Sequence, residues 1–164
     1  MKKLLMLVVF VFVAGAVFAS QTDPATGEAK AKIVAPLAIT HATGAALNFG
    51  TLVSPKNGAG TVTISNANPG QATDSGVERI TVDPVSSDHF TVTNPDNVSY
   101  SAAVTEASIT VKNPNNDEMT VSAFTPSCTS SCTATDIYVG GQLAIGQNQA
   151  SGVYSGQYHI TLTY

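Results

Sequence analysis

Two cysteines, Cys128 and Cys132 in the stretch CTSSC, are the residues of this sequence with the most obvious chemistry. Cysteines this close together either form a disulfide or belong to a redox motif. The redox motif has two residues between its cysteines and lies in a strand–helix–strand unit, whereas this stretch has three intervening residues and no helical pattern. The spacing therefore predicts a structural disulfide that pins a loop tip. Its stabilising effect should lie near the low end of about 2–4 kcal/mol, because the closed loop is short.

The three histidines, His41, His89 and His159, are the candidate general bases. One lies in a loop, one at the start of a predicted strand and one on the outer face of the last predicted strand. Neither G-x-S-x-G nor H-E-x-x-H occurs, and no other motif pairs a histidine with a nucleophile. We therefore expect exposed, non-catalytic histidines, no catalytic residue and no enzymatic activity.

Three stretches rich in Asn and Asp, residues 83–89, 94–97 and 113–118, could offer oxygen ligands to Ca²⁺. None of them has the spaced Asp-x-Asp-x-Asp-Gly pattern, and Asn, Asp and Pro are also the residues that tight turns use. We expect turn-forming loops, with no metal site and no cofactor. The sequence does not decide whether these loops bind calcium.

The elements that must position these residues are β-strands. Apolar residues recur at every second position in short runs, and clusters of Gly, Pro, Asn and Asp separate the runs. The spacing of about 8–12 residues is typical of an antiparallel sandwich or barrel, and residues 66–76 are predicted to be a long loop. The first predicted strand has one apolar face, made by Ala29, Ala31, Ile33, Ala35, Leu37 and Ile39. Further strands are predicted at residues 62–64, 80–82, 90–92, 98–104, 109–111, 119–124, 137–139, 143–145 and 154–164.

The last predicted strand has the clearest alternation. One face carries Tyr154, Tyr158, Ile160, Leu162 and Tyr164, while the odd-numbered positions between them are polar. At roughly 25 cal/mol per Å² of buried apolar surface, burying such a face is worth several kcal/mol. We expect this row to lie in the core of the protein's own fold rather than on an exposed sugar-binding surface.

The amino terminus predicts export. Residues 1–19, MKKLLMLVVFVFVAGAVFA, have two lysines, an apolar run and a small-residue end, which is the layout of a signal peptide cleaved after Ala19. About sixteen apolar residues fall short of the roughly 20 that span a bilayer, and Ser20 is not the cysteine of a lipoprotein. We expect residues 20–28 to be a flexible polar segment and residues 29–164 to be one domain. An exported chain reaches an oxidising compartment, which favours the disulfide.

Charge limits the partners of the exported chain. Removing residues 1–19 takes away two lysines and no acid, so five basic residues remain against eleven acidic ones, a net charge of −6. Neither nucleic acid nor an anionic membrane surface attracts such a chain. We expect no nucleic-acid partner and no stable membrane insertion after the signal peptide is cleaved.

Several stretches give the chain a family resemblance. They are AKIVAPLAIT, LNFGTLV with GTVTIS, HFTVTN, VSYSAAV, ITVKN with EMTVSAF, and above all the closing VGGQLAIGQNQASGVYSGQYHITLTY. From about Ala29 to Tyr164 the chain resembles the exported bacterial domains called domain of unknown function 4402 (DUF4402). The resemblance implies a single immunoglobulin-like antiparallel β-sandwich, similar to fimbrial subunits, that is secreted or surface-located and has no established activity.

These observations favour an exported, non-enzymatic structural or surface-assembly protein, either a fimbria-like subunit or a cell-surface component. It would lie in the periplasm, at the cell surface or outside the cell, and would pair with itself or with other surface subunits through edge strands. The residues ahead of Ala29 lack large alternating apolar side chains, so they do not indicate a strand for donation. One alternative is a stand-alone secreted module that binds a glycan or a protein. A less favoured alternative is a small outer-membrane β-barrel, which the terminal Tyr164 suggests but the short strands and missing aromatic girdles oppose.

Overall fold

The computed structural model describes residues 22–80 and 82–164, so the predicted signal peptide lies outside the described residues. Ile33–Tyr164 form a compact unit that contains every strand given below. The described residues contain β-strands, turns and bends, and among them there is no helix that could cross a bilayer. The prediction of an all-β, antiparallel fold is confirmed.

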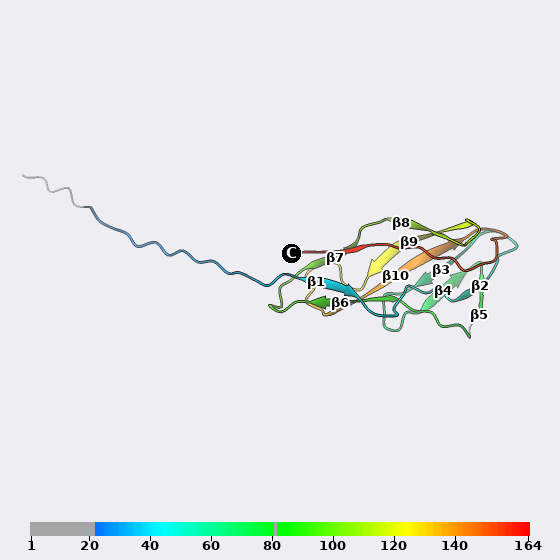
Figure 1. The fold of residues 1–164 in the computed structure, drawn as a ribbon, viewed down its shortest axis with the longest axis horizontal. Helices are drawn as coiled ribbons and strands as arrows, with labels where there is room; N and C mark the ends of the chain where they lie inside the picture. The colour runs from blue at the N-terminus through cyan, green and yellow to red at the C-terminus, as the bar shows by residue number, and fades with distance from the viewer. Residues whose placement is uncertain (1–21, 81) are drawn as a thin grey trace, which may run out of the picture. The chain divides into compact units, whose positions relative to one another are not determined.

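The main sheet is built around β10 (Asp136–Ile145), the longest strand (Figure 1). One edge of β10 pairs first with β6 (Asp88–Thr93) and then with β3 (Gly60–Ile64), and the other edge pairs with β9 (Glu118–Pro126). Three further strands pair with these: β1 (Ala38–His41) with β6, β4 (Ala72–Ser75) with β3, and β8 (Ser108–Lys112) with β9. All of these pairings are antiparallel.

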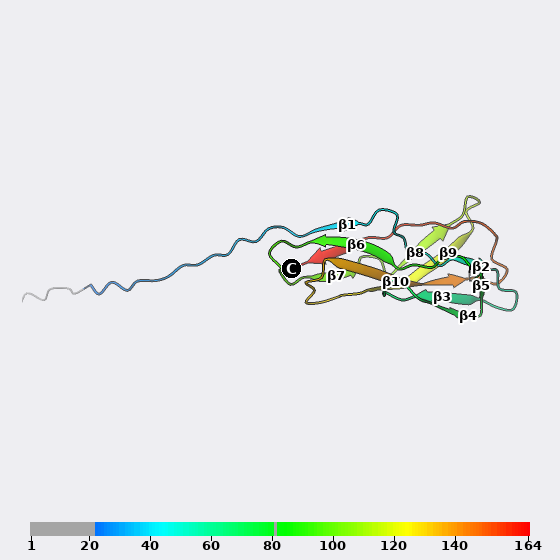
Figure 2. The same ribbon diagram turned by 90° about the horizontal axis from the view of Figure 1, so that it is seen from below.

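Two small sheets complete the unit. In one, β7 (Ser101–Val104) pairs with β11 (Ile160–Thr163); in the other, β2 (Thr51–Val53) pairs with β5 (Glu78–Ile80). Figures 1 and 2 agree that β1, β6 and β7 lie toward one end of the compact unit and that β2, β3, β4 and β5 lie toward the other.

The core has two clusters that share strand β10. Its odd-numbered residues lie on one face, because side chains alternate along a strand. The first cluster joins β6 and the start of β10 to β7 and β11, and the second joins the end of β10 to β3, β8 and β9. Phe124 packs against both. Their buried members are Phe90, Val92, Tyr100, Ala102, Cys132, Ile137 and Val139 in the first cluster, and Val62, Ile64, Val111, Val121, Leu143 and Ile145 in the second.

A bulge in β9 allows one strand to serve both clusters. The register between β9 and β10 shifts between Gly140 and Gln142, and Ala123 on the opposite strand has a φ of 51°. The extra residue interrupts the alternation of side chains along β9. As a result, Val121 and Phe124 both pack inward although they are three positions apart.

The first predicted strand, with its apolar face from Ala29 to Ile39, is formed only from Ala38 onward, and residues 29–37 are not strand. The first strand begins at Ala38, and the Ile33 side chain is 94% exposed. None of the described strands pairs with this stretch. The Ala35 N–H donates to the Asp96 side chain, the Leu37 N–H donates to Tyr164 Oη, and Pro36 has no N–H to donate. Alternating apolar residues show which side chains could share a face, but a strand also needs a neighbouring strand for its backbone hydrogen bonds.

Other boundaries differ from the prediction for similar reasons. Residues 66–76 were expected to be a loop but include β4, which is polar because it lies at a sheet edge. The two strands predicted at 137–139 and 143–145 are one strand, because Gly140 and Gly141 continue the ladder between them. Val82 lies outside β5 and is 84% exposed.

Four members of the carboxyl-terminal row pack inward. Tyr154 lies against the second cluster, and Tyr158, Ile160 and Leu162 lie against the first, although only Ile160–Thr163 is regular strand. The prediction that Tyr164 belongs to the core is wrong, because this side chain is 64% exposed. It follows the last paired residue of β11, and its hydroxyl reaches outward to the backbone of Ala35 and Leu37.

Candidate functional site

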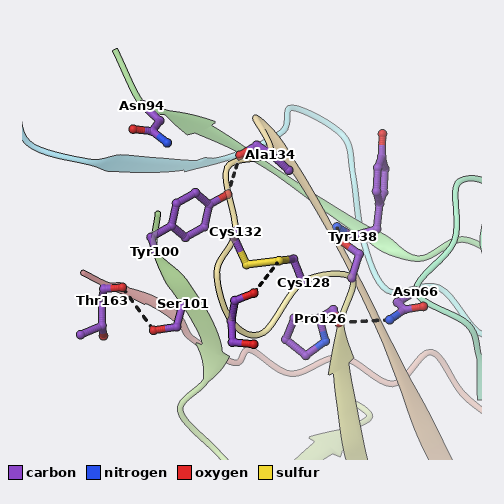
Figure 3. The surroundings of a disulfide bond; sticks show 12 residues. Asn66, Asn94, Tyr100, Ser101, Pro126, Cys128, Cys132, Ala134, Tyr138 and Thr163 are labelled. Carbon is purple, nitrogen blue, oxygen red and sulfur yellow. Dashed lines mark hydrogen bonds between the residues drawn. A yellow bond between two sulfur atoms is a disulfide. The ribbon is translucent and has the colours of Figure 1, made fainter. Parts of the chain in front are cut away.

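The predicted disulfide between Cys128 and Cys132 is present (Figure 3). Its loop contributes more than a pinned tip, because Cys132 is buried in the first core cluster. Tyr100 and Cys132 exchange two backbone hydrogen bonds, and the Tyr100 hydroxyl donates to the carbonyl of Ala134. The disulfide loop therefore helps to cover one end of the core.

We expect thiol reagents to label no cysteine in the unfolded, unreduced protein and two after reduction. Replacing Cys128 and Cys132 together by Ala should lower the free energy of unfolding by about 2 kcal/mol, because the short loop is no longer closed. Urea unfolding of both forms measures the difference. Labelling of two sulfurs without reduction would show that the loop is open in the native protein.

Each histidine pairs with a carboxylate on a neighbouring segment. His41 on β1 lies 2.7 Å from Asp88 on β6, and His89 on β6 lies 2.8 Å from Asp136 on β10. The same pattern joins the two segments next to the β7–β11 pair, where His159 lies 2.6 Å from Glu106. The sequence pattern does not predict these pairs, because the histidines and their carboxylates become neighbours only through strand register. Asp88 and His89 are consecutive residues of β6, so the side chains of the first two pairs lie on opposite faces of the sheet.

In the two surface pairs, His159–Glu106 and His89–Asp136, the histidine lowers the pKa of the carboxylate. Hydrogen bonds from His159 lower the pKa of Glu106, and a hydrogen bond from His89 lowers the pKa of Asp136. The His89 ring also stacks on Tyr138, with 4.7 Å between ring centroids. Both arrangements fit cross-strand pairing at a sheet surface.

Asp88 is the centre of a buried polar group. It is only 5% exposed, and its carboxylate accepts hydrogen bonds from the His89 backbone N–H at 2.9 Å and from Tyr158 Oη at 2.7 Å, in addition to its pairing with His41. Burial, and secondarily the hydrogen bond to Asp88, raises the pKa of the Tyr158 hydroxyl. A tyrosine held in its neutral form is a donor and a poor nucleophile. The group therefore ties the carboxyl-terminal segment to β6 and β1, rather than forming a catalytic triad.

The raised pKa of Tyr158 makes stability sensitive to alkaline pH. Its unfolded form loses the proton near the ordinary pKa of 10.0, before the folded form does. Below pH 10.0 the Tyr158 hydroxyl makes its full contribution to the free energy of unfolding. Above that pH, the free energy of unfolding should fall by about 1.4 kcal/mol per pH unit. Urea unfolding on both sides of that pH should show a smaller slope for Tyr158→Phe. The slope should not vanish, because burial also raises the pKa of Tyr100. An unchanged slope would mean that the Tyr158 hydroxyl titrates normally.

Two of the three stretches rich in Asn and Asp, residues 94–97 and 113–118, use their side chains to close turns. Asn94 Nδ2 and Oδ1 bond to the backbone of Val98, and Asn113 bonds to the backbone of Asn115 and to both the backbone and the side chain of Asp117. Across residues 22–80 and 82–164 no three His, Cys, Asp or Glu side chains come together in a way that could hold a metal ion. Turn formation accounts for these two stretches, whereas Asp88 of the third begins β6 and is buried.

An apolar cavity of about 710 Å³ lies over the second core cluster. Its floor is formed by residues of β8, β9 and β10, and its walls by residues 46–54 and 149–156. This volume lies within the range of small-ligand and peptide sites. The sequence carries no signal for this cavity, because its two walls are about a hundred positions apart in the chain and meet only in the fold. It is a candidate binding site for an apolar ligand or segment.

Comparison with known proteins identifies the family. A family model described as domain of unknown function (DUF4402) matches residues 37–164. No curated protein and no solved structure matches the chain. The matched region begins one residue before β1 and includes every strand of the compact unit. The chain therefore belongs to the DUF4402 family.

Proposed function

We propose that this chain is an exported, non-enzymatic structural protein of the cell surface or of a fimbria-like assembly, built on an immunoglobulin-like β-sandwich. The two core clusters support the sandwich. In the first, β7 and β11 supply side chains that pack against those of β1, β6 and β10, as the two inner faces of a sandwich do.

The observation that carries the proposal is the disulfide built into the first core cluster. Such bonds persist in oxidising compartments, and residues 1–19 have the layout of a signal peptide. The non-enzymatic part is supported by the histidines, each of which is engaged by a carboxylate in a separate place. A scaffold stabilised in this way suits a component that must persist outside the cytosol.

Fractionation of the producing cells, with mass spectrometry of the purified chain, tests the proposal. We expect a mature amino terminus at Ser20 and recovery from the periplasm, the surface or the medium. Immunogold electron microscopy would then separate a filament from a diffuse coat. A cytosolic chain that retains residues 1–19 and has reduced cysteines would contradict the proposal.

A stand-alone binding module is the second candidate, and the apolar cavity favours it. Its ligand would be a glycan or a protein segment that reaches the cavity or the loops around it. A glycan array and a pull-down from the extracellular medium distinguish this role from a purely structural one.

A further inference from the structure

The two walls of the apolar cavity are extended segments with one bonded edge each. On one wall, Asn48 exchanges two backbone hydrogen bonds with Ser86. On the other, Ser155 exchanges two with Lys112. Successive residues of an extended chain direct their backbone groups to opposite edges, so the neighbours of Asn48 and Ser155 face away from these partners.

The opposite edges have no hydrogen-bond partner within the described residues. The backbone N–H and C=O groups of Leu47 and Phe49 make no hydrogen bond there, and neither do those of Tyr154, Gly156 and Tyr158. Consecutive residues of both segments line the cavity, residues 47–49 on one wall and 154–156 on the other. The cavity is therefore bordered by two unpaired strand edges.

The floor between these edges is apolar. Ile109, Val121 and Leu143 line it from β8, β9 and β10. A small apolar ligand could fill the volume but would leave the backbone groups of both walls unpaired. An added β-strand would cover the floor with alternate side chains and pair the wall edges through its backbone.

The chain itself carries an extended segment of matching character. Residues 29–33 are exposed, and Ile33 is 94% exposed although it is a large aliphatic residue. Ala29, Ala31 and Ile33 share one face of the alternation, and Lys30 and Lys32 share the other. Such a segment could place small and apolar side chains on the cavity floor while its lysines stay in solvent.

We propose that residues 29–34 of a second copy of this chain add as a β-strand to the cavity, between residues 47–49 and residues 154–158. This inference rests on the proposed assembly function and names its contact. The donated segment and the receiving cavity are different surfaces, so the contact is head-to-tail and can continue from copy to copy.

Two exposed valines give a matched test of the receiving side. Val153 lines the cavity and is 83% exposed, while Val82 is 84% exposed and is not part of the lining. Both can become Arg without disturbing the core. Sedimentation velocity of the full mature chain over a range of concentrations should show self-association that Val153→Arg weakens about tenfold or more and Val82→Arg leaves unchanged.

A second pair of variants, at Ile33 and Lys32, tests the donated segment. Ile33→Ser should weaken self-association about tenfold or more, because it removes the only large side chain on the inward face, whereas Lys32→Ser should not. A labelled peptide of residues 29–37 should bind wild-type chain and lose affinity for the Val153→Arg variant.

A wild-type chain that stays monomeric at every concentration overturns the inference, even if the peptide binds, because the segment would then serve its own molecule. The inference is also overturned if neither Ile33→Ser nor Val153→Arg changes the strength of self-association. Neither result affects export or surface location, so the failure of this contact is distinguishable from the failure of the proposed function.

Discussion

Gly140→Ala should lower the free energy of unfolding by about 3 kcal/mol and the melting temperature by about 10 °C. A Cβ at Gly140 would overlap the carbonyl oxygen of Ile64 and would lie 2.8 Å from the backbone nitrogen of Asn66. Both atoms belong to the backbone, so no change of rotamer relieves the contact. Calorimetry or urea unfolding of the purified chain measures the loss.

The site explains why the effect should be large. Gly140 lies between Val139, which pairs with β6, and Gly141, which pairs with the end of β3. The chain leaving β3 crosses β10 at this point. A methyl group at Gly140 would push this chain away from β10 and would disturb the pairing of β10 with β3 and with β6.

The neighbouring glycine is the matched control. A Cβ at Gly141 would meet Leu47 Cδ2 at 3.1 Å and Phe124 Cδ1 at 3.4 Å, which are the ends of side chains that can move. Gly141→Ala also restricts the unfolded chain, which offsets part of any strain, so stability should change by less than about 1 kcal/mol. Equal losses for both substitutions would show that the chain leaving β3 does not pass close to Gly140.

Asp88→Ala should also lower the free energy of unfolding by about 3 kcal/mol. The substitution removes the acceptor for Tyr158 Oη and for the His89 N–H, which then remain part-buried without a partner. His41 is about half exposed and can bond to water instead. Chemical denaturation measures the loss.

A double-mutant cycle separates the buried hydrogen bond from the loss of side-chain volume. Combined with Tyr158→Phe, Asp88→Ala should cost less than the sum of the two single changes, because the two residues share one interaction. Asp136→Ala is the control at a surface histidine pair and should change stability little, because solvent screens that pair. Additive effects at Asp88 and Tyr158 would mean that their hydrogen bond contributes nothing.

Much of the site chemistry could be predicted from local sequence. The spacing of Cys128 and Cys132 was sufficient to predict a disulfide, because four positions along a chain allow the two sulfurs to meet whatever the surrounding fold. The inward face of Tyr154, Tyr158, Ile160 and Leu162 also followed from alternation alone. The carboxylate partners of the histidines could not be predicted, because each partner is 47 or 53 positions away and is selected by strand register.

The same period-two pattern was right in one place and wrong in another. It described Tyr158 to Leu162 correctly but failed for residues 29–37, although both stretches alternate. The difference lies outside the segments. β11 has β7 beside it, whereas the stretch before β1 has only isolated side-chain partners at Ala35 and Leu37.

The amino-acid sequence by itself determined that this chain forms antiparallel strands, which side chains of those strands turn inward, and that Cys128 pairs with Cys132. These properties depend on residues a few positions apart. Only the tertiary structure decided which strands pair with which, that the chain leaving β3 passes over β10 at Gly140, and that two wall segments border an apolar cavity. Backbone hydrogen bonds are the same for every residue type, so the choice between partner strands depends on how the whole set of side chains packs.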